Sequence, residues 1–478
     1  MSRGSRRLTR RGFVRAGAGL AAAGTGLTRL PIWQRALAST GVRKPGSLPD
    51  PRRRAGAPTE LMPFDHVVVV MMENHSFDNY FGMLPRRGHP RIDGFSFDRQ
   101  GRPSNRQPYQ DGYVTPVHAT SMCQPEGVDQ TWRGTHIQID GGKMDGFPQT
   151  SKGSMLYWDE SDLPFYYSLA KTFTVGERWF CSAPCQTFPN RRFLLGATAD
   201  GLIATDTTSV LDDPPPSGTI FDHLNEHGIG WTNYFSDLPA TGVWYSIPRD
   251  NLDKIAPVAK FYADCAAGTL PSVSFVDPEF GALSDVMGGL SAAVEAIPQL
   301  APLASKVSSQ GGDEENPQNI EYGEAFCASV IDAVIKSPAW PRTLLIWTYD
   351  EHGGYFDHVP PPATLPPDST RPRLGPNDPP GGYDLLGPRV PSIVVSPYSK
   401  PGGITRTVHD HTSVLATIEA KWNLPALTYR DANATTVMDF LDTRKPRLLR
   451  PPPLAAHGSL PGSVAGCSND DPELVVRH

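Results

Sequence analysis

Two long apolar runs that end in polar clusters predict the framework of the fold. Residues 67–72 and 343–349 are hydrophobic almost throughout and contain no glycine or proline, as is typical of strands buried on both faces of a parallel sheet. The polar residues that follow are Glu73, Asn74 and His75 after the first run and Asp350, Glu351 and His352 after the second. Parallel strands end at one edge of a sheet, where α/β proteins bind ligands. We therefore expect these side chains to lie close together.

Shorter segments add further elements. The pattern predicts strands at residues 231–235, 272–276 and 391–397 and helices at residues 163–172, 220–227, 321–335 and 409–422. Strands that alternate with helices indicate a layered α/β fold. Residues 83–125 and 360–382 are rich in proline or glycine and are predicted to be surface loops.

Another predicted helix begins beside Thr187. Pro189 suits a first helical turn, and residues 191–198 continue the helix with apolar positions. Backbone N–H groups at a helix N-terminus favour an anion such as phosphate, so Thr187 is a candidate to act on phosphate. The simpler interpretation is that Thr187 only caps the helix.

The acids at the two strand ends predict a metal site. Carboxylates that are brought together repel one another, and a divalent cation removes that repulsion. We predict that Glu73, Asn74, Asp350 and Glu351, with Thr187, hold one divalent ion. Oxygen ligands favour Ca²⁺, Mg²⁺ or Mn²⁺ over Zn²⁺, but the identity stays open. The alternative is that the acids pair with arginines or cap helices.

Histidines near these segments are candidates for proton transfer. A metal would lower the pKa of the Thr187 hydroxyl and polarise a phosphoryl oxygen. The leaving alkoxide then needs a proton, which histidine can donate near neutral pH. The candidates are His136, His352, His358 and His411, although a loop histidine is more often an ordinary surface residue.

The N-terminus is predicted to be a twin-arginine signal peptide, residues 1–38. Arg10 and Arg11 precede a stretch rich in glycine and alanine, and residues 36–38 offer a small-residue cleavage site. We expect a secreted or cell-envelope protein that is exported by the twin-arginine machinery. Six cysteines suit that compartment, although their pairing stays open.

The remaining boundaries follow composition. Residues 39–60 are predicted to be a linker, 61–442 the catalytic domain, and 443–478 a proline-rich, disordered tail. The net charge of −6 argues against binding nucleic acid through a basic surface. Beyond the N-terminus, no segment is apolar over the length of about 18 residues that a membrane span needs.

Several motifs resemble the bacterial phosphoesterase family, which includes phosphatidylcholine-preferring phospholipases C and an acid phosphatase. The strings are ENHSFDNYFG, GGKMDGF, TFPNR, YDEHGGYFDHVPPP and RVPSIVVSPY followed by DHTS, and the match runs from about residue 64 to about residue 442. The resemblance implies an alkaline-phosphatase-like three-layer α/β sandwich with a central, mostly parallel sheet. It also implies the metal ligands above and a phospho-enzyme intermediate on Thr187.

The resemblance also implies substrate contacts, and the chain departs from the family pattern at two positions. Asn190 and Arg191 of the TFPNR motif are expected to bind substrate, as are Gln130 and Asn316. Members of the family often carry histidine at the last two positions. Glutamine and asparagine can hydrogen-bond a phosphate but do not readily donate a proton, so the leaving-group acid is open.

The leading prediction is a secreted phospholipase C that acts on phosphatidylcholine-like lipids, with transient contact to a membrane surface. The alternative is an acid-phosphatase-type phosphomonoesterase with the same nucleophile. A third interpretation, from another class, is an exported metal-binding surface protein with little catalytic activity.

Overall fold

The computed structural model describes residues 41–125, 127–280, 312–450, 452–458 and 472–478. The chain divides into two units, residues 1–44 and 45–478, and the second contains all helices and strands of the described residues. The predicted signal peptide lies outside the described residues.

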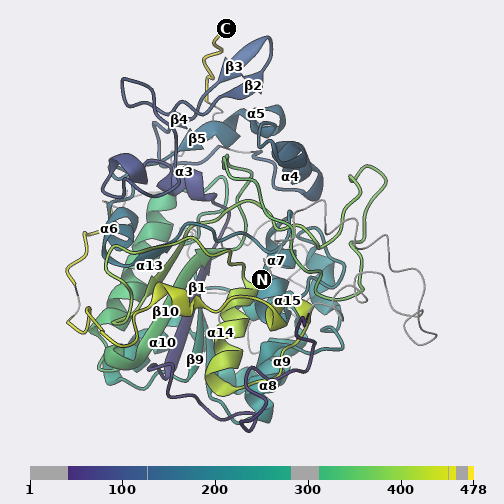
Figure 1. Cartoon of the computed structure of the whole chain (residues 1–478), viewed down its shortest axis with the longest axis vertical. Coiled ribbons are helices and arrows are strands. Elements are labelled where there is room, and N and C mark those ends of the chain that lie inside the picture. Colours follow the sequence, from purple (N-terminus) through teal and green to yellow (C-terminus); the bar gives the residue numbers. More distant parts are fainter. Residues whose placement is uncertain (1–40, 126, 281–311, 451, 459–471) are drawn as a thin grey trace, which may run out of the picture. The chain divides into compact units, whose positions relative to one another are not determined.

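One eight-stranded sheet forms the centre of the second unit (Figure 1). In spatial order its strands are β12 (Ile404–Thr405), β6 (Thr174–Gly176), β11 (Ser392–Val395), β10 (Thr343–Tyr349), β1 (His66–Met72), β9 (Val273–Asp277), β7 (Trp231–Phe235) and β8 (Ile255–Pro257). Only β11 runs antiparallel to its neighbours β10 and β6. The predicted mostly parallel sheet is therefore confirmed, and the two long apolar runs are adjacent central strands.

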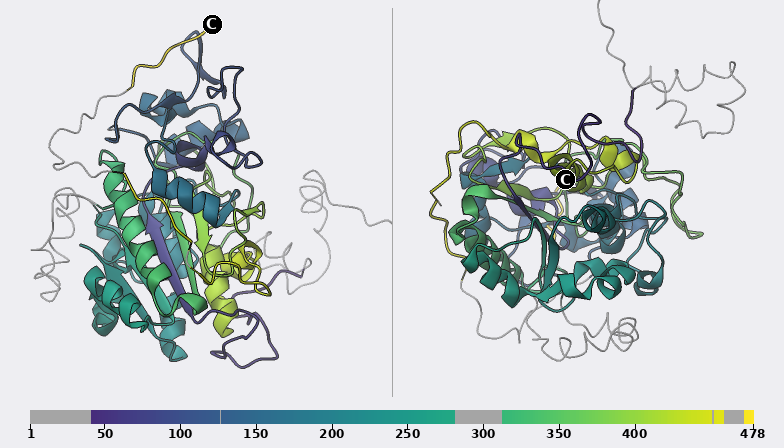
Figure 2. Two further views of the ribbon diagram at one scale, coloured as in Figure 1. Left: turned by 90° about the vertical axis from the view of Figure 1, so that its left-hand side faces the viewer. Right: turned by 90° about the horizontal axis from the view of Figure 1, so that it is seen from below.

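Helices cover both faces of this sheet (Figures 1 and 2). One face carries α6 (Pro164–Thr172), α10 (Val258–Ala267) and α13 (Ile320–Lys336), and the other carries α7 (Thr187–Gly196), α8 (Ile220–Glu226) and α14 (Thr412–Trp422). On the first face, Trp347 of β10 packs on Tyr166 of α6, with ring centroids 4.7 Å apart. On the second, Phe275 of β9 packs on Phe221 of α8 at 5.2 Å. This is the predicted three-layer sandwich.

Shorter elements complete the described structure. They are α3 (Phe77–Phe81), β2 (Gln107–Tyr109), β3 (Gly112–Val114), β4 (Val117–His118), α4 (Trp132–Ile139), α5 (Phe147–Thr150), β5 (Leu156–Tyr157), α9 (Ser246–Asp250) and α15 (Tyr429–Ala432). The stretch 83–125, predicted to be loops, thus contains three short strands. Strands of two or three residues are too short to show a period in the sequence.

The predicted linker and tail are partly bound to the body. Gly46 donates to the Ala426 carbonyl at 2.7 Å, and Asn423, which follows α14, donates to the Asp50 carbonyl at 3.1 Å. Near the other terminus, Trp340 donates to the Leu448 carbonyl at 3.0 Å, and Arg477 pairs with Tyr113 through two backbone hydrogen bonds. At these positions the predicted linker and tail therefore make specific hydrogen bonds to the rest of the second unit.

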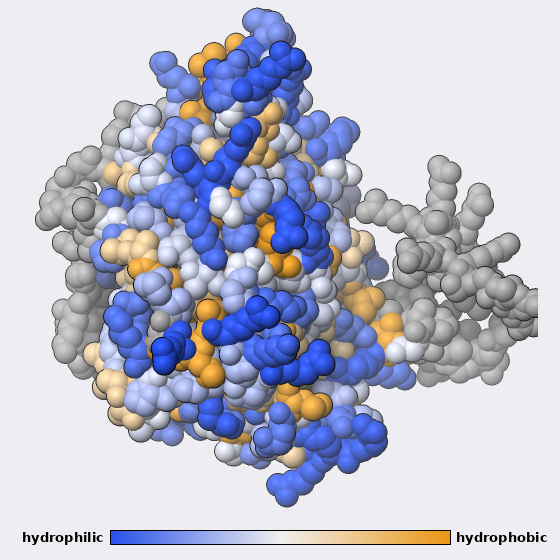
Figure 3. Space-filling model, turned by 60° about the vertical axis from the view of Figure 1, so that its left-hand side comes forward, coloured by the Kyte–Doolittle hydropathy of each residue, from blue (hydrophilic) through white to orange (hydrophobic). Residues whose placement is uncertain are grey.

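The cysteines and the surface add two observations. Cys181, Cys185, Cys265 and Cys327 are free and buried, and Cys123 is disulfide-bonded. Cys181 and Cys185, which are separated by three residues, are therefore small buried residues and do not form a local disulfide. No helix among the described residues is long and apolar enough to span a bilayer. The face in Figure 3 is dominated by hydrophilic residues, with small separate hydrophobic patches.

Candidate active site

Acids from neighbouring strands meet at one edge of the sheet. Met72 lies opposite Tyr349 in the parallel pair β1–β10, so Glu73 and Asp350 leave the sheet side by side. The Asn74 N–H donates to Asp350 Oδ1 at 3.2 Å. The predicted convergence of the two polar clusters is confirmed for these residues. The parallel neighbour β9 ends at the same edge with Asp277. The sequence shows the same pattern here, an apolar strand and then an acid, so Asp277 could have been predicted in the same way.

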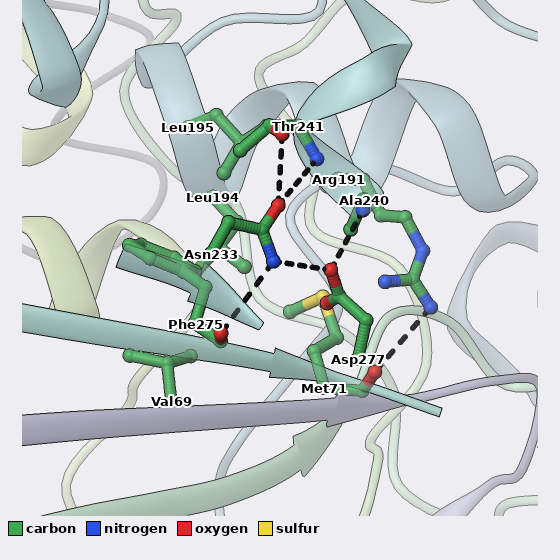
Figure 4. Close-up of a pocket in the computed structure, with 10 residues that line it drawn as sticks. All are labelled: Val69, Met71, Arg191, Leu194, Leu195, Asn233, Ala240, Thr241, Phe275 and Asp277. Carbon is green, nitrogen blue, oxygen red and sulfur yellow. Dashed lines mark hydrogen bonds between the residues drawn. The ribbon is translucent and has the colours of Figure 1, made fainter. Parts of the chain in front are cut away.

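Arg191 of α7 lies between the two strand ends. Its Nε donates to Asp350 Oδ2 at 3.1 Å and an Nη donates to Glu73 Oε1 at 3.2 Å. The Phe280 ring lies 4.6 Å from the guanidinium carbon, and Asp277 lies close by (Figure 4). Arg191 is buried with these partners, so the interpretation that strand-end acids pair with an arginine holds for Glu73 and Asp350.

The cavity beside Arg191 is too small to admit a substrate. It has a volume of about 10 Å³, which is the space of one water molecule. Figure 4 shows its lining, in which the Asn233 amide donates to Asp277 Oδ2 at 2.6 Å. Burial raises the pKa of Asp277 to about 6.

Acidic groups outnumber basic groups around Arg191. Burial, only partly offset by Arg191, raises the pKa of Glu73 to about 8, and it also raises the pKa of the other acids. The acids are Glu73, Asp313, Glu315, Asp350 and Glu351. Within the described part of the chain, Arg191 is the only arginine or lysine paired with any of them. Both oxygens of Asp313 and Oε1 of Glu351 are buried without a hydrogen-bond partner.

Asp313 and Glu315 were not singled out by sequence reasoning. They lie in an acidic stretch without periodicity, and the stretch is anchored through the neighbouring Glu314. The Glu314 carboxylate accepts hydrogen bonds from Tyr80, Tyr166 and Tyr349, the first two at 2.9 and 2.7 Å. This anchor holds the segment against the sheet edge.

Thr187 contacts Asn74, the residue that follows Glu73. It is the first residue of α7, and Gln186 occupies the cap position, so the interpretation of Thr187 as the cap is wrong. The residue is 4% exposed, and its hydroxyl donates to Asn74 Oδ1 at 3.3 Å. Asn74 adopts φ +71°, a left-handed conformation that asparagine tolerates better than most residues. Its backbone oxygen would lie 1.8 Å from a Cβ at Gly353, so only glycine fits there.

Asn190 shapes the approach to Thr187. Its Oδ1 accepts from the Ala183 N–H at 3.0 Å, and its amide nitrogen donates to the carbonyls of Ala183, Cys185 and Gln186 at 2.8–3.2 Å. The predicted substrate ligand thus has its amide hydrogens committed to the segment that leads into α7.

Of the four candidate histidines, His352 and His411 contact the acid cluster. His352 Nε2 donates to Gln138 Oε1 at 2.7 Å, and its Nδ1 lies 3.1 Å from Glu351 Oε2. His411 Nε2 donates to the Asp350 carbonyl at 2.6 Å, and its Nδ1 accepts from Trp179 at 3.5 Å. Burial lowers the pKa of His411 to about 4. Both nitrogens of His411 are therefore used within the fold.

His358 and His136 lie in other surroundings. The His358 ring contacts Asp78 Oδ2 at 2.6 Å and Asp93 Oδ1 at 3.1 Å. Burial opposes charge on this ring, but the two carboxylates outweigh it and raise the pKa to about 10. His136 donates through Nδ1 to the Trp132 carbonyl at 2.7 Å. Among the described residues, no hydrogen bond or ion pair joins either ring to Thr187.

The two residues that depart from the family pattern flank the cluster. Gln130 donates to Glu315 Oε1 at 3.4 Å. Asn316 donates to the Tyr355 hydroxyl at 2.8 Å and to the Pro125 carbonyl at 3.1 Å. Gln130 therefore touches the acid cluster directly, whereas the Asn316 amide is bound to the neighbouring loops.

Comparison with known proteins identifies the family of the chain. A model of the Phosphoesterase family matches residues 64–425. The chain belongs to the Phosphoesterase family. It is 31% identical over 411 residues to non-specific phospholipase C1 of Arabidopsis thaliana, which covers 80% of this chain and 72% of that protein. It is 30% identical over 452 residues to non-hemolytic phospholipase C of Pseudomonas aeruginosa, with 87% of this chain and 60% of that protein covered.

Solved structures resemble this phosphoesterase more distantly. A protein of the alkaline phosphatase superfamily from Vibrio parahaemolyticus is 10% identical, with a TM-score of 0.39 over 90% of this chain and 79% of that one. The family match classes the chain as a phosphoric ester hydrolase.

Within the described residues of this phosphoesterase, acidic and histidine side chains come together in two groups with the spacing of metal ligands. Two groups bring three ligand atoms within 4.8 Å of one another: Asp78 with Asp357 and His358, and His118 with Asp159 and Asp162. The first is already occupied by Arg389, which donates to Asp357 and Asp78. The acids around Thr187 fit a cation for a different reason, because their charge exceeds that of Arg191 and several of their oxygens lack partners.

Proposed function

We propose that this phosphoesterase is a metal-dependent phospholipase C that cleaves phosphatidylcholine-like lipids into diacylglycerol and a phosphorylated head group. The observation that carries the proposal is the position of the Thr187 hydroxyl, 3.3 Å from Asn74 Oδ1, beside the acids at the sheet edge. The names of the relatives support the substrate class. The proposal includes one divalent ion held by Glu73, Asn74, Asp350, Glu351 and Thr187.

In this proposal Thr187 is the nucleophile of a two-step transfer. Its Oγ1 bonds to phosphorus while the bond from phosphorus to the diacylglycerol oxygen breaks, and the hydroxyl proton is transferred, in net terms, to that leaving oxygen. Water then attacks the phosphothreonine, releases the phosphorylated head group and restores the hydroxyl. The N-terminus of α7 offers N–H groups and a positive dipole to the phosphoryl oxygens.

The other residues of the site have separate proposed roles. The metal, when bound, would lower the pKa of the Thr187 hydroxyl and polarise a phosphoryl oxygen. Asn190 holds the segment before Thr187 in place, and Arg191 holds Glu73 and Asp350 together at the sheet edge. Gln130 borders the acid cluster and is the proposed phosphate contact there.

The replacement Thr187→Ala tests the proposal. We expect turnover of p-nitrophenyl phosphorylcholine and of phosphatidylcholine vesicles to fall by at least about 10⁴-fold, because loss of a catalytic nucleophile has effects of that order. The matched control Thr187→Ser retains a hydroxyl and should keep measurable activity. A folded Thr187→Ala protein with most of its activity would overturn the role of this residue.

Substrate choice and metal dependence need separate assays. Preference for p-nitrophenyl phosphorylcholine over p-nitrophenyl phosphate supports the phospholipase, and the reverse supports an acid-phosphatase-type phosphomonoesterase. Loss of activity with a chelator, and its return with a divalent ion, supports the metal. No turnover on either ester or on vesicles favours the metal-binding surface protein.

We also propose export by the twin-arginine pathway, from the order of paired arginines, apolar stretch and small residues in the first 38 positions. A reporter fused behind residues 1–38 should leave the cytoplasm. Replacement of Arg10 and Arg11 by lysine should retain it there. Equal export of the two fusions would refute this route.

A further inference from the structure

The side chain of Gln138 in α4 has a fixed orientation. Its amide nitrogen donates to the Asp129 carbonyl at 2.7 Å, to Thr150 Oγ1 at 3.0 Å and to the Gly354 carbonyl at 3.4 Å. Carbonyl oxygens only accept hydrogen bonds, so the NH₂ group must face them. The Oε1 atom of Gln138 must therefore face the imidazole of His352, 2.7 Å from Nε2.

This orientation fixes the proton on the imidazole. Because Gln138 Oε1 only accepts, Nε2 of His352 carries the hydrogen, and in the neutral ring Nδ1 presents a lone pair. Nδ1 lies 3.1 Å from Glu351 Oε2, yet it is buried and makes no hydrogen bond. Two acceptors thus face each other in a site where both side chains have no exposed surface.

A cation is needed between these acceptors, and the surroundings favour a metal ion over a proton. Oε2 of Glu351 already accepts the Gly353 N–H at 2.7 Å, and Oε1 has no partner. Asp350, Glu315 and Glu73 are further acidic neighbours of Glu351 in the same cluster. One proton would neutralise one charge of this group, whereas a divalent ion neutralises two.

We propose that His352 is an additional ligand of the metal ion, bound through Nδ1 beside the Glu351 carboxylate, and that Gln138 is the residue that positions it. The inference rests on the metal site of the proposed function. The 3.1 Å between Nδ1 and Oε2 matches the separation of about 3 Å for two ligands at right angles, each about 2.1 Å from one ion.

A nitrogen ligand changes the class of metal that the site prefers. Imidazole suits Zn²⁺, Co²⁺ and similar transition metals, whereas Ca²⁺ and Mg²⁺ take oxygen ligands. The site is therefore of mixed oxygen and nitrogen character, in contrast to the oxygen-only set inferred from the two strand ends. The Gln138–His352 bond is the kind of outer contact that fixes the tautomer of a metal-bound histidine.

Two replacements of His352 separate its ring nitrogens. In His352→Asn the side-chain oxygen can take the position of Nδ1, and in His352→Gln the amide nitrogen can take the position of Nε2. The matched control is His89→Gln, because His89 is also buried and bonds through Nε2, to the Ala170 carbonyl. Metal-free proteins are titrated with Co²⁺ and with Ca²⁺, and the visible spectrum of bound Co²⁺ is recorded.

We expect Co²⁺ affinity to fall by at least about 100-fold in His352→Gln, since loss of outer contacts alone costs 10–100-fold. His352→Asn should lose less, both variants should change the Co²⁺ spectrum, and Ca²⁺ affinity should fall by less than Co²⁺ affinity. His89→Gln should match the wild-type protein. Circular dichroism and melting curves identify any variant that fails to fold.

The outcomes separate this inference from the proposed function. Wild-type Co²⁺ affinity and spectrum in a folded His352→Gln protein would overturn the ligand role and leave the metal site standing. A greater loss in His352→Asn than in His352→Gln would show that Nε2 matters, and would also overturn it. If the wild-type protein binds neither ion, the metal dependence of the proposed function fails as well.

Discussion

Two buried arginines, Arg191 and Arg389, each bind acids from the polar ends of strands and loops, yet their surroundings differ. Arg389 donates to both oxygens of Asp357 at 3.0 and 3.2 Å and to Asp78 Oδ1 at 3.0 Å. With His358 protonated and Arg178 paired to Asp93, three positive groups balance three carboxylates. No buried side-chain atom of these six residues lacks a partner within the described part of the chain.

The Arg191 cluster has the opposite character. One guanidinium faces five acids, and the atoms without partners include Nη1 of Arg191, Nδ2 of Asn74 and Oε1 of Glu351. A buried polar network that is fully satisfied stabilises the fold, whereas one left unsatisfied costs free energy unless a ligand completes it. The comparison therefore favours a structural role for the Arg389 cluster and supports the proposed ligand-binding role of the Arg191 cluster, although both arginines lie in the family motifs.

The matched replacements Arg389→Met and Arg191→Met test that assignment, and their effects should be the largest. Each leaves buried carboxylates without their cation, so each metal-free variant should lose about 3–5 kcal/mol of unfolding free energy. For Arg191→Met, saturating metal should reduce the deficit relative to wild type, because the ion supplies the positive charge that the variant lacks and so stabilises the variant more than the wild-type protein. Urea unfolding with and without metal measures the deficit of each variant.

The deficit of Arg389→Met should be the same with and without metal. Equal recovery of the two variants by metal would contradict the division between a structural and a ligand-binding cluster. Recovery of Arg389→Met alone would reverse it and place the ion at Asp78, Asp357 and His358.

The sequence predicted the meeting of the two strand ends because buried parallel strands have a strong local signal. Residues 67–72 and 343–349 are so uniformly apolar that both are recognised as buried parallel strands. Because parallel strands end at one edge of the sheet, the proximity of Glu73 and Asp350 could be predicted as well. Thr187 was located for a similar reason, since Pro189 marks a helix start within two residues.

The contacts that decide function could not be predicted in the same way. The direction of Arg191 depends on the rotation of α7 against β1 and β10, which no local pattern encodes. Gln138 and His352 are 214 positions apart, and neither stands in a recognisable spacing with the other. Asp313 and Glu315 lie in a loop, where acids are usually solvated. The chemistry of this site is therefore set by long-range packing.

The acid cluster should make the metal-free protein less stable as pH rises. The pKa of Glu73 is raised from its ordinary value to about 8 in the folded protein, so its protonated form favours folding. That contribution is fully present below about pH 4.5 and is lost as pH rises through about 8. We expect a loss of roughly 3 kcal/mol between pH 5 and pH 8. Melting curves of chelator-treated protein measure it.

Saturating metal should reverse this slope, because metal ligands bind in their deprotonated form. The increase in melting temperature on adding metal should thus be larger at pH 8 than at pH 5. The variant Glu73→Gln should flatten the slope of the metal-free protein. A metal-free wild-type protein that gains stability from pH 5 to pH 8 would refute the excess of buried negative charge.

The replacement His358→Gln should have the smallest effect. For His358 the charged form of the side chain stabilises the fold, whereas for Glu73 it is the neutral form. The folded pKa of His358 is raised to about 10, above the value of about 6.5 for the unfolded chain, so the charged ring stabilises the fold. This stabilisation is fully present below about pH 6.5 and disappears as pH rises through 10. We expect a deficit of about 2 kcal/mol at pH 6 that approaches zero near pH 11.

The matched control is His411→Gln, because burial lowers the pKa of His411 to about 4 and its deficit should not change between pH 6 and pH 11. A deficit of His358→Gln that stays constant from pH 6 to pH 11 would mean that His358 is neutral in the folded protein, and the charge balance assigned to the Arg389 network would then be wrong.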